Sequence, residues 1–286
     1  MAQPPSAFGV GDEVSRISPV WLVLGSILSV QFGAAIAKTL FDEVGPSGMV
    51  WLRLLTSTLV FLVLIRPRVR GRTRQDWLAV VAYGASLALM NWAIYQSFAR
   101  IPIGLAVTLE FLGPLAVAML GSRTPRDLLW AALAGVGVLL LGVGPSDLDA
   151  TGVLFALLAG AGWAGYILAG KLVGGRWKGL DGLAVSSTLA TLLVAGPALT
   201  ADVGALWRPD VLLIGAAVGL MSSVVPYSLE LIALRRMPPR VFGILMSLEP
   251  AAAALAAFLL LRESLSPWEV MAMLCVVIAS VGATRG

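Results

Sequence analysis

Long apolar runs recur along almost the whole of this 286-residue chain, and they constrain its fold more than any other feature. Each run is about 20 residues long, which is the length that a helix needs to cross a hydrocarbon core of roughly 30 Å. Hydrophobic residues make up 58% of the chain and charged residues only 13%, which no soluble domain of this size needs. The sequence therefore predicts an all-α integral membrane protein.

Ten of these runs are predicted to be transmembrane helices joined by short connections. They cover residues 20–40, 46–65, 77–98, 102–121, 126–143, 151–171, 182–200, 211–232, 240–261 and 267–284. The run that follows the polar residues 1–18 is too long for a signal-peptide core and lacks a clear cleavage site. We therefore expect residues 1–18 to form a cytoplasmic tail and the first helix to be retained.

The basic residues predict how the chain is oriented in the membrane. With the N-terminus inside, 15 of the 20 Lys and Arg residues fall in cytoplasmic segments, three in outer segments, and two, Lys38 and Arg53, in spans. Because cytoplasmic loops carry such an excess, both termini are predicted to be cytoplasmic. The net charge of +4 is explained by this bias, so we expect no nucleic-acid binding.

An internal repeat has an offset close to half the chain. The repeated residues are Arg100, Pro102 and Pro114, which recur 136 residues later as Arg236, Pro238 and Pro250, and Lys38, which recurs 133 residues later as Lys171. Each half holds five predicted spans, an odd number, so the second half enters the membrane with the opposite orientation. The sequence thus predicts two inverted five-helix repeats, over residues 19–143 and 151–284, an arrangement typical of carriers with a midplane site.

Several functional classes are disfavoured by what the sequence lacks. The chain has no histidine, which removes zinc motifs of the HExxH type and histidine-based catalytic triads, and it has no Walker loop for ATP. We therefore expect neither an enzyme nor a bound metal or cofactor. Transport must then be driven by an ion gradient or by the gradient of the substrate.

Two carboxylates lie beside prolines inside apolar runs, where a charge costs roughly 2.5–3.5 kcal/mol on insertion scales. Glu249 directly precedes Pro250, and Glu110 lies four residues before Pro114. A proline removes a backbone donor and frees the carbonyl one turn earlier, which is tolerated at this depth only where protein or a wet cavity receives it. We predict helix breaks at Pro114, Pro250 and Pro226, and a functional site that contains both glutamates.

A third acid, Glu230, is expected near the cytoplasmic end of the eighth span, close to Arg235 and Arg236. The favoured interpretation is a structural ion pair or a gate, and the alternative is a substrate ligand. If protons are the coupling ion, these three intramembrane carboxylates are their candidate carriers.

The cations inside the spans are Lys38, near the outer end of the first, and Arg53, within the second. Arg53 must face the protein interior, because an isolated Arg in lipid is costly and its planar fork suits a carboxylate. Two interpretations are open: an ion pair with Glu110 or Glu249 that only permits burial, or direct binding of a substrate carboxylate. Both hold if the pair opens to admit a zwitterion.

Further hydrogen-bonding side chains lie in the apolar spans: Gln31, Asn91, Tyr95, Tyr166 and Tyr227. Taken one at a time, each is better explained by contact with a neighbouring helix than by a ligand. As a set, they are candidates to line a cavity.

Four segments together carry a family resemblance over residues 19–284. They are QFGAAIAKTLF at residues 31–41, the stretch over residues 83–114 that ends in EFLGP, GWAGYILAG from Gly162, and PYSLELIALRRMPPRVFGILMSLEP at residues 226–250. The chain resembles the EamA branch of the drug/metabolite transporter superfamily, and more closely its threonine/homoserine exporters of the bacterial inner membrane. This resemblance implies a ten-helix inverted-repeat fold and export of small amino acids in exchange for protons.

The resulting hypothesis is an exporter of small neutral amino acids that works by alternating access. Glu249 and Glu110 are expected to bind the substrate ammonium or the coupling proton, and Arg53 and Lys38 the substrate carboxylate. The alternatives are an exporter of other metabolites or drugs, whose cavity would be wider, and a pore or non-transporting scaffold. The sequence does not predict the oligomeric state.

Overall fold

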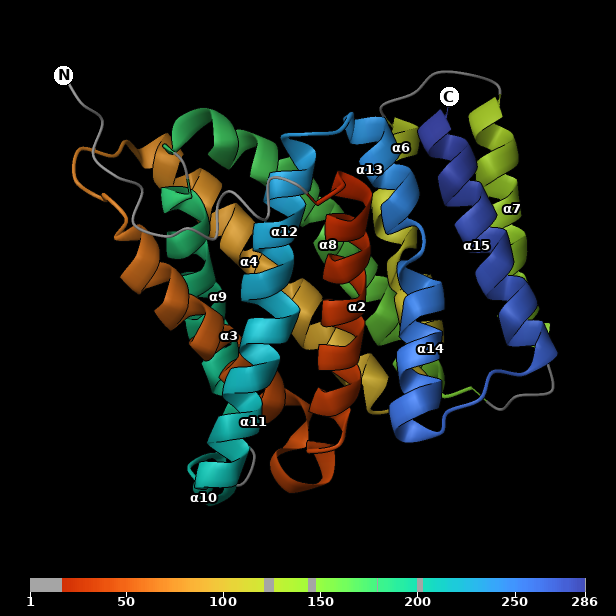
Figure 1. Ribbon diagram of the computed structural model, residues 1–286, viewed down its shortest axis with the longest axis horizontal. Coiled ribbons are helices and arrows are strands. Elements are labelled where there is room, and N and C mark those ends of the chain that lie inside the picture. The colour runs from red at the N-terminus through yellow and green to blue at the C-terminus, as the bar shows by residue number, and fades with distance from the viewer. Residues whose placement is uncertain (1–16, 121–125, 144–147, 179, 200–202, 286) are drawn as a thin grey trace.

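The computed structural model describes residues 17–120, 126–143, 148–178, 180–199 and 203–285, so most of the predicted tail over residues 1–18 lies outside the described residues. Within these ranges the chain forms helices and no strands. The helices pack side by side as a bundle (Figure 1). Their bounds are α2 (Pro19–Lys38), α3 (Phe41–Ile65), α4 (Arg74–Phe98), α5 (Ile103–Glu110), α6 (Leu112–Leu120), α7 (Arg126–Val143), α8 (Ala150–Arg176), α9 (Asp181–Ala198), α10 (Val203–Leu206), α11 (Pro209–Gly219), the π-helix η1 (Leu220–Val224), α12 (Val225–Leu234), α13 (Pro239–Met246), α14 (Glu249–Leu261) and α15 (Pro267–Arg285).

Each predicted span coincides with a helix, or with consecutive helices, whose ends lie within five residues of the expected ones. One of the largest differences is at α3, which begins five residues early because the chain kinks at Gly45 (φ 67°), so that the regular span starts at Pro46 as predicted. Nine segments of the described chain are long and apolar enough to cross a membrane, whereas the apolar stretch in α7 is shorter and covers Leu128–Leu140. Ten crossings therefore stay a prediction.

The outer surface of the bundle is apolar, as the bilayer requires. Four leucines on different helices or at their ends are more than 70% exposed: Leu64, Leu120, Leu128 and Leu213. Water-soluble monomers rarely expose large contiguous apolar surface. This surface and the spanning helices are those of a multi-pass membrane protein.

The helix bounds repeat with the same offset as the sequence. α5 begins after Pro102 and ends at Glu110, and α13 begins after Pro238 and ends at Met246, so both ends are displaced by 136 residues. Each short helix is followed by a second one, α6 or α14, after an interruption. The inverted relation of the two halves is not tested by this match and stays a prediction.

Candidate functional site

A central cavity of about 140 Å³ lies among α2, α3, α4, α5, α8, η1, α12, α13 and α14. Seven of the nine predicted site residues line it, namely Gln31, Arg53, Asn91, Glu110, Tyr166, Tyr227 and Glu249. Lys38 and Tyr95 are not among the lining residues. The packing of these helices therefore brings together residues that are far apart in the sequence.

The interruption between α5 and α6 presents Glu110 to this cavity. The break falls at Phe111, three residues before the proline expected to cause it, because proline is tolerated in the first turn of the following helix. Pro114 lacks the N–H that would bond to the carbonyl of Glu110. The Glu110 residue is 8% exposed and lies at the last position of α5.

The interruption between α13 and α14 presents Glu249 to the same cavity, but from the start of the second helix, whereas Glu110 lies at the end of the first. Ser247 and Leu248 separate the two helices, Glu249 is the first residue of α14, and Pro250 is the second. The start of a helix carries a partial positive charge that favours an anion. Glu249 is 7% exposed and lines the cavity. The partial positive charge at the start of α14 therefore stabilises its carboxylate in the cavity wall.

The predicted break at Pro226 takes a milder form, because the chain continues through the π-helix η1 into α12. Pro226 cannot donate to the carbonyl of Ser222, four residues earlier. Arg53 supplies the missing donor: its Nη2 donates to the Ser222 carbonyl oxygen at 2.8 Å, and its Nε donates to Ser223 Oγ at 3.4 Å. The proline thus creates the acceptor that holds the buried guanidinium.

Arg53 makes no ion pair with Glu110 or Glu249 among the described residues, so the ion pair that was one of its two open interpretations is not formed in this structure. Its guanidinium instead lies 5.6 Å from the centre of the Tyr95 ring. Tyr95 is fully buried and its hydroxyl has no hydrogen-bond partner. The positive charge therefore reaches the cavity without being neutralised by direct contact with a carboxylate.

Glu230 is a third acid in the cavity wall, although its neighbours in the sequence favoured a pair or gate near the helix end. Ser26 Oγ donates to its carboxylate at 2.5 Å. With Glu110 and Glu249, it makes three carboxyl groups facing the cavity against one guanidinium, that of Arg53. The cavity is therefore suited to accept additional positive charge, as an ammonium group or as protons.

Lys38 lies at one end of the bundle and does not line the cavity, and its expected role as a ligand of the substrate carboxylate stays a prediction. Its Nζ lies 2.6 Å from Glu263 Oε1, and the other carboxylate oxygen accepts a hydrogen bond from the backbone N–H of Ile103 at 2.9 Å. Lys38 also donates to the Ile101 carbonyl at 3.5 Å. These contacts join the end of α2 to the start of α5 and to the segment after α14.

Two buried polar atoms in the cavity wall lack a hydrogen-bond partner within the described part of the chain: Gln31 Oε1 and Ser222 Oγ. Buried polar groups in proteins are almost always bonded, so these two are available for a ligand or for water. Sequence reasoning missed Ser222. It could have been found, because Ser222 precedes Pro226 by four residues, as Glu110 precedes Pro114.

The remaining predicted residues combine packing with exposure to the cavity. Asn91 Nδ2 donates to the Leu87 carbonyl of its own helix at 2.9 Å. Tyr166 stacks on Tyr83 with ring centres 4.6 Å apart, and Tyr227 lies 6.3 Å from the Phe61 ring. Packing therefore fixes the orientation of these side chains in the wall.

Comparison with known proteins adds relatives of nearly the same length. The model of the EamA-like transporter family matches residues 150–285. The threonine/homoserine exporter RhtA of Escherichia coli strain K12 is 42% identical over 276 residues, covering 94% of this chain and 93% of that protein. The exporter of the same name from Salmonella typhimurium strain LT2 is 41% identical over 277 residues, covering 94% of each. A solved crystal structure that is 18% identical shares the fold, with a TM-score of 0.60 over 93% of this chain and 96% of that one.

Proposed function

Since this chain belongs to the EamA-like transporter family, we propose that it exports small neutral amino acids such as threonine and homoserine from the bacterial cytoplasm, in exchange for protons. It is a transporter and not an enzyme. The excess of basic residues in the loops at one end of the bundle supports cytoplasmic termini.

The observation that carries this proposal is the distribution of charge in the cavity. Arg53 is held on one wall by the Ser222 carbonyl, while Glu110 and Glu249 approach from two helix interruptions. A zwitterionic amino acid carries a carboxylate that can bind Arg53 and an ammonium that can bind Glu110 or Glu249. Charge-assisted hydrogen bonds of this kind are roughly twice as strong as neutral ones.

The size of the cavity favours an amino acid over the alternative of a drug. Its volume of about 140 Å³ is well below the range of roughly 300–1,000 Å³ found for drug-sized ligands. The polar groups in its wall are also numerous for so small a space: Gln31 Oε1 and Ser222 Oγ have no hydrogen-bond partner among the described residues and lie in the same wall as the charged side chains. A small polar substrate uses these groups, whereas a bulky apolar one leaves them unpaired.

Alternating access is supported by a difference between the two ends of the bundle. At the end of the bundle where α5 begins, this helix packs on α14 so closely that a Cβ at Gly104 would lie 2.8 Å from the Ala254 Cα atom. Under the 136-residue offset, α13 corresponds to α5 and α6 corresponds to α14. Within the described residues, α13 and α6 do not pack on each other in a comparable way. We infer a conformation that is closed at the outer end, where Lys38 pairs with Glu263.

Counterflow in proteoliposomes tests the proposed function. Vesicles loaded with unlabelled threonine should accumulate labelled threonine transiently, and the initial rate should saturate with concentration, because a carrier exchanges one bound substrate for another. Vesicles without protein provide the background. Entry that neither saturates nor overshoots would identify a pore, and absence of any threonine-dependent signal would refute the amino-acid assignment.

The outer closure is tested by Glu263→Gln in a Cys275→Ser background that carries a single cysteine at Ala34, a cavity-lining position. Losing the partly exposed ion pair with Lys38 costs about 1 kcal/mol, which changes a two-state ratio about fivefold. Labelling of the cysteine by an impermeant thiol reagent added outside should therefore rise severalfold.

Glu43→Gln is the matched control for this experiment, because Glu43 pairs with Arg208 at 2.8 Å and does not join α2 to α5. It should leave the labelling rate unchanged. An unchanged rate in Glu263→Gln would remove the ion pair from the closure.

A further inference from the structure

A second pocket has a volume of about 440 Å³. The segments that form it lie at the opposite end of the bundle from the end of α2 and the segment after α14, which are at the lower side of Figure 1. The pocket is formed by the segment between α3 and α4 and the segment between α8 and α9, at the upper left in Figure 1. Its wall includes Arg68, Arg70, Arg72 and Lys178. None of the residues that line it lines the central cavity.

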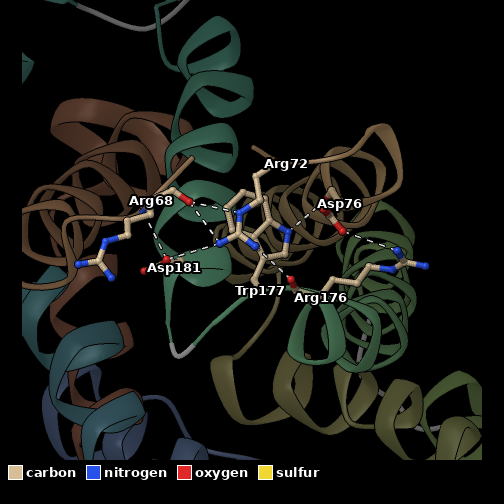
Figure 2. Close-up of polar contacts among 6 residues, drawn as sticks. All are labelled: Arg68, Arg72, Asp76, Arg176, Trp177 and Asp181. Atoms are coloured by element: carbon tan, nitrogen blue, oxygen red, sulfur yellow. Dashed lines mark hydrogen bonds and ion pairs between the residues drawn. The ribbon is translucent and has the colours of Figure 1, made fainter. Parts of the chain in front are cut away.

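Arg72 holds the two segments of this pocket together (Figure 2). Its guanidinium stacks 4.1 Å from the centre of the Trp177 ring and donates to the carbonyls of Arg68 at 3.2 and 3.3 Å and of Arg176 at 3.1 Å. It also lies 3.7 Å from Asp181 Oδ2, which accepts from the Arg68 backbone N–H at 3.3 Å. Arg72 is thus fully used in shaping the pocket.

The start of α4 is fixed to the end of α8 by a second set of contacts, visible in part in Figure 2. Thr73 and Asp76 form a reciprocal capping box, and Asp76 lies 3.6 Å from the Arg176 guanidinium. The indole Nε1 of Trp177 donates to the Asp76 carbonyl at 3.1 Å. The pocket is therefore preorganised, which lowers the entropic cost of binding a ligand.

The positive charge at this pocket exceeds what its own acids neutralise. Residues 66–76 and 176–181 hold seven basic and two acidic side chains, a net charge of +5. The two acids, Asp76 and Asp181, contact Arg176 and Arg72. Within the described chain, Arg68, Arg70 and Lys178 belong to the pocket wall, are exposed and make no ion pair. They remain available for an anion.

The surroundings of the pocket place that anion at the membrane surface. Trp77, 41% exposed, packs edge-on against Trp177 with ring centres 5.9 Å apart, and tryptophan prefers the headgroup level. Exposed apolar side chains adjoin the basic ones, with Leu180 in the pocket wall and Val69 between Arg68 and Arg70. A ligand with an anionic headgroup and acyl chains would contact both the basic and the apolar side chains.

We propose that this pocket binds the phosphodiester headgroup of an anionic phospholipid of the inner leaflet, with Arg68, Arg70 and Lys178 as its ligands. Basic pockets between transmembrane helices bind anionic headgroups in this way, and Arg matches phosphate oxygens bidentately. The site is separate from substrate transport. Its occupancy stabilises the junction of α3, α4, α8 and α9.

The test uses the full-length protein purified in a neutral detergent. Phosphatidylglycerol should raise the midpoint of thermal unfolding by several degrees in a concentration-dependent manner, because a ligand that binds only the folded state stabilises it. Phosphatidylcholine should have little effect. The variant Arg68→Gln/Arg70→Gln should need at least about tenfold more phosphatidylglycerol for the same shift, given roughly tenfold affinity per 1.4 kcal/mol.

The matched control is Arg66→Gln/Arg74→Gln, which removes the same charge from the same segment but from residues outside the pocket wall. It should respond to phosphatidylglycerol nearly as the wild type does. Equal losses in the two double variants would show a diffuse surface charge and overturn the pocket assignment. Equal protection by inorganic phosphate would show a free-anion site and overturn the lipid assignment.

If the double variant is unstable without lipid, Lys178→Gln provides a milder variant. The side chain of Lys178 makes none of the contacts through which Arg72 joins the two segments. It should also weaken the response to phosphatidylglycerol, and an unaltered response would remove Lys178 from the site. All of these measurements are made without transport, so failure of either proposal leaves the other standing.

Discussion

Glu249→Gln should lower threonine export at least about tenfold while the protein still inserts and folds normally. Removing the charge reduces the cost of placing this residue in the membrane. It also removes one charge-assisted contact to the substrate or proton, worth roughly 1.5–3 kcal/mol, and 1.4 kcal/mol already corresponds to a tenfold change. The measurement is export of labelled threonine, corrected for the amount of folded protein in the membrane.

Two assays on the same variant distinguish the roles open to Glu249. If its carboxylate carries the coupling proton, Glu249→Gln should lose export driven by a pH gradient but keep threonine counterflow, which needs no net proton movement. If it binds the ammonium, both activities should fall together. Glu43→Gln, an acid that pairs with Arg208 outside the cavity, is the control and should keep both. Wild-type export and counterflow in Glu249→Gln would reassign Glu249 to packing.

The helical architecture could be predicted because its cause is local. A run of about 20 apolar residues has to be helical in a bilayer, where backbone groups find no water. The interruptions beside Pro114 and Pro250 were predictable for the same reason, since a missing N–H affects a carbonyl at a known distance along the chain. Their positions shifted to Phe111 and to Ser247–Leu248, because each proline fits within the first turn of the next helix.

The charged residues of the candidate site could be predicted from the sequence, because a charge inside a membrane span has to face the protein interior. Arg53, Glu110 and Glu249 had to face the interior, and they line one cavity. The partner of Arg53 was not predictable from charge, because it is a carbonyl freed by Pro226 and not a carboxylate. To predict this contact, one needs both the loss of the N–H donor at Pro226 and the packing of η1 against α3, and the second is not evident from the sequence.

The position of Lys38 could not be predicted from its charge. An ammonium near a span end can reach a cavity or the membrane surface, and the sequence placed it with Arg53 on the basis of charge alone. Its partner, Glu263, lies in the last third of the chain, after α14. The close approach of α5 to α14 at Gly104 brings this acid to the end of α2, and that approach is a property of the tertiary packing.

Threonine and homoserine should compete for transport, whereas threoninol, which lacks the carboxylate, should compete poorly. Without a carboxylate in the site, the buried guanidinium of Arg53 keeps only the Ser222 carbonyl and the Ser223 hydroxyl, and part of its hydrogen-bonding capacity is left unused. An unpaired buried group costs about 1–3 kcal/mol, and more when it is charged. The inhibition constants of the amino acid and the amine should thus differ at least about tenfold.

Arg53→Gln should narrow that difference, because it weakens binding of the amino acid much more than binding of the amine. Arg53→Lys keeps the charge but loses the planar fork that also reaches Ser223, so it should recover only part of the discrimination. Both variants are compared with wild type by competition against labelled threonine, at matched protein levels. If threoninol competes with threonine equally well in the wild type, Arg53 does not bind a carboxylate. The three carboxyl groups of the cavity would then favour a cation or drug as the exported substrate on the same fold.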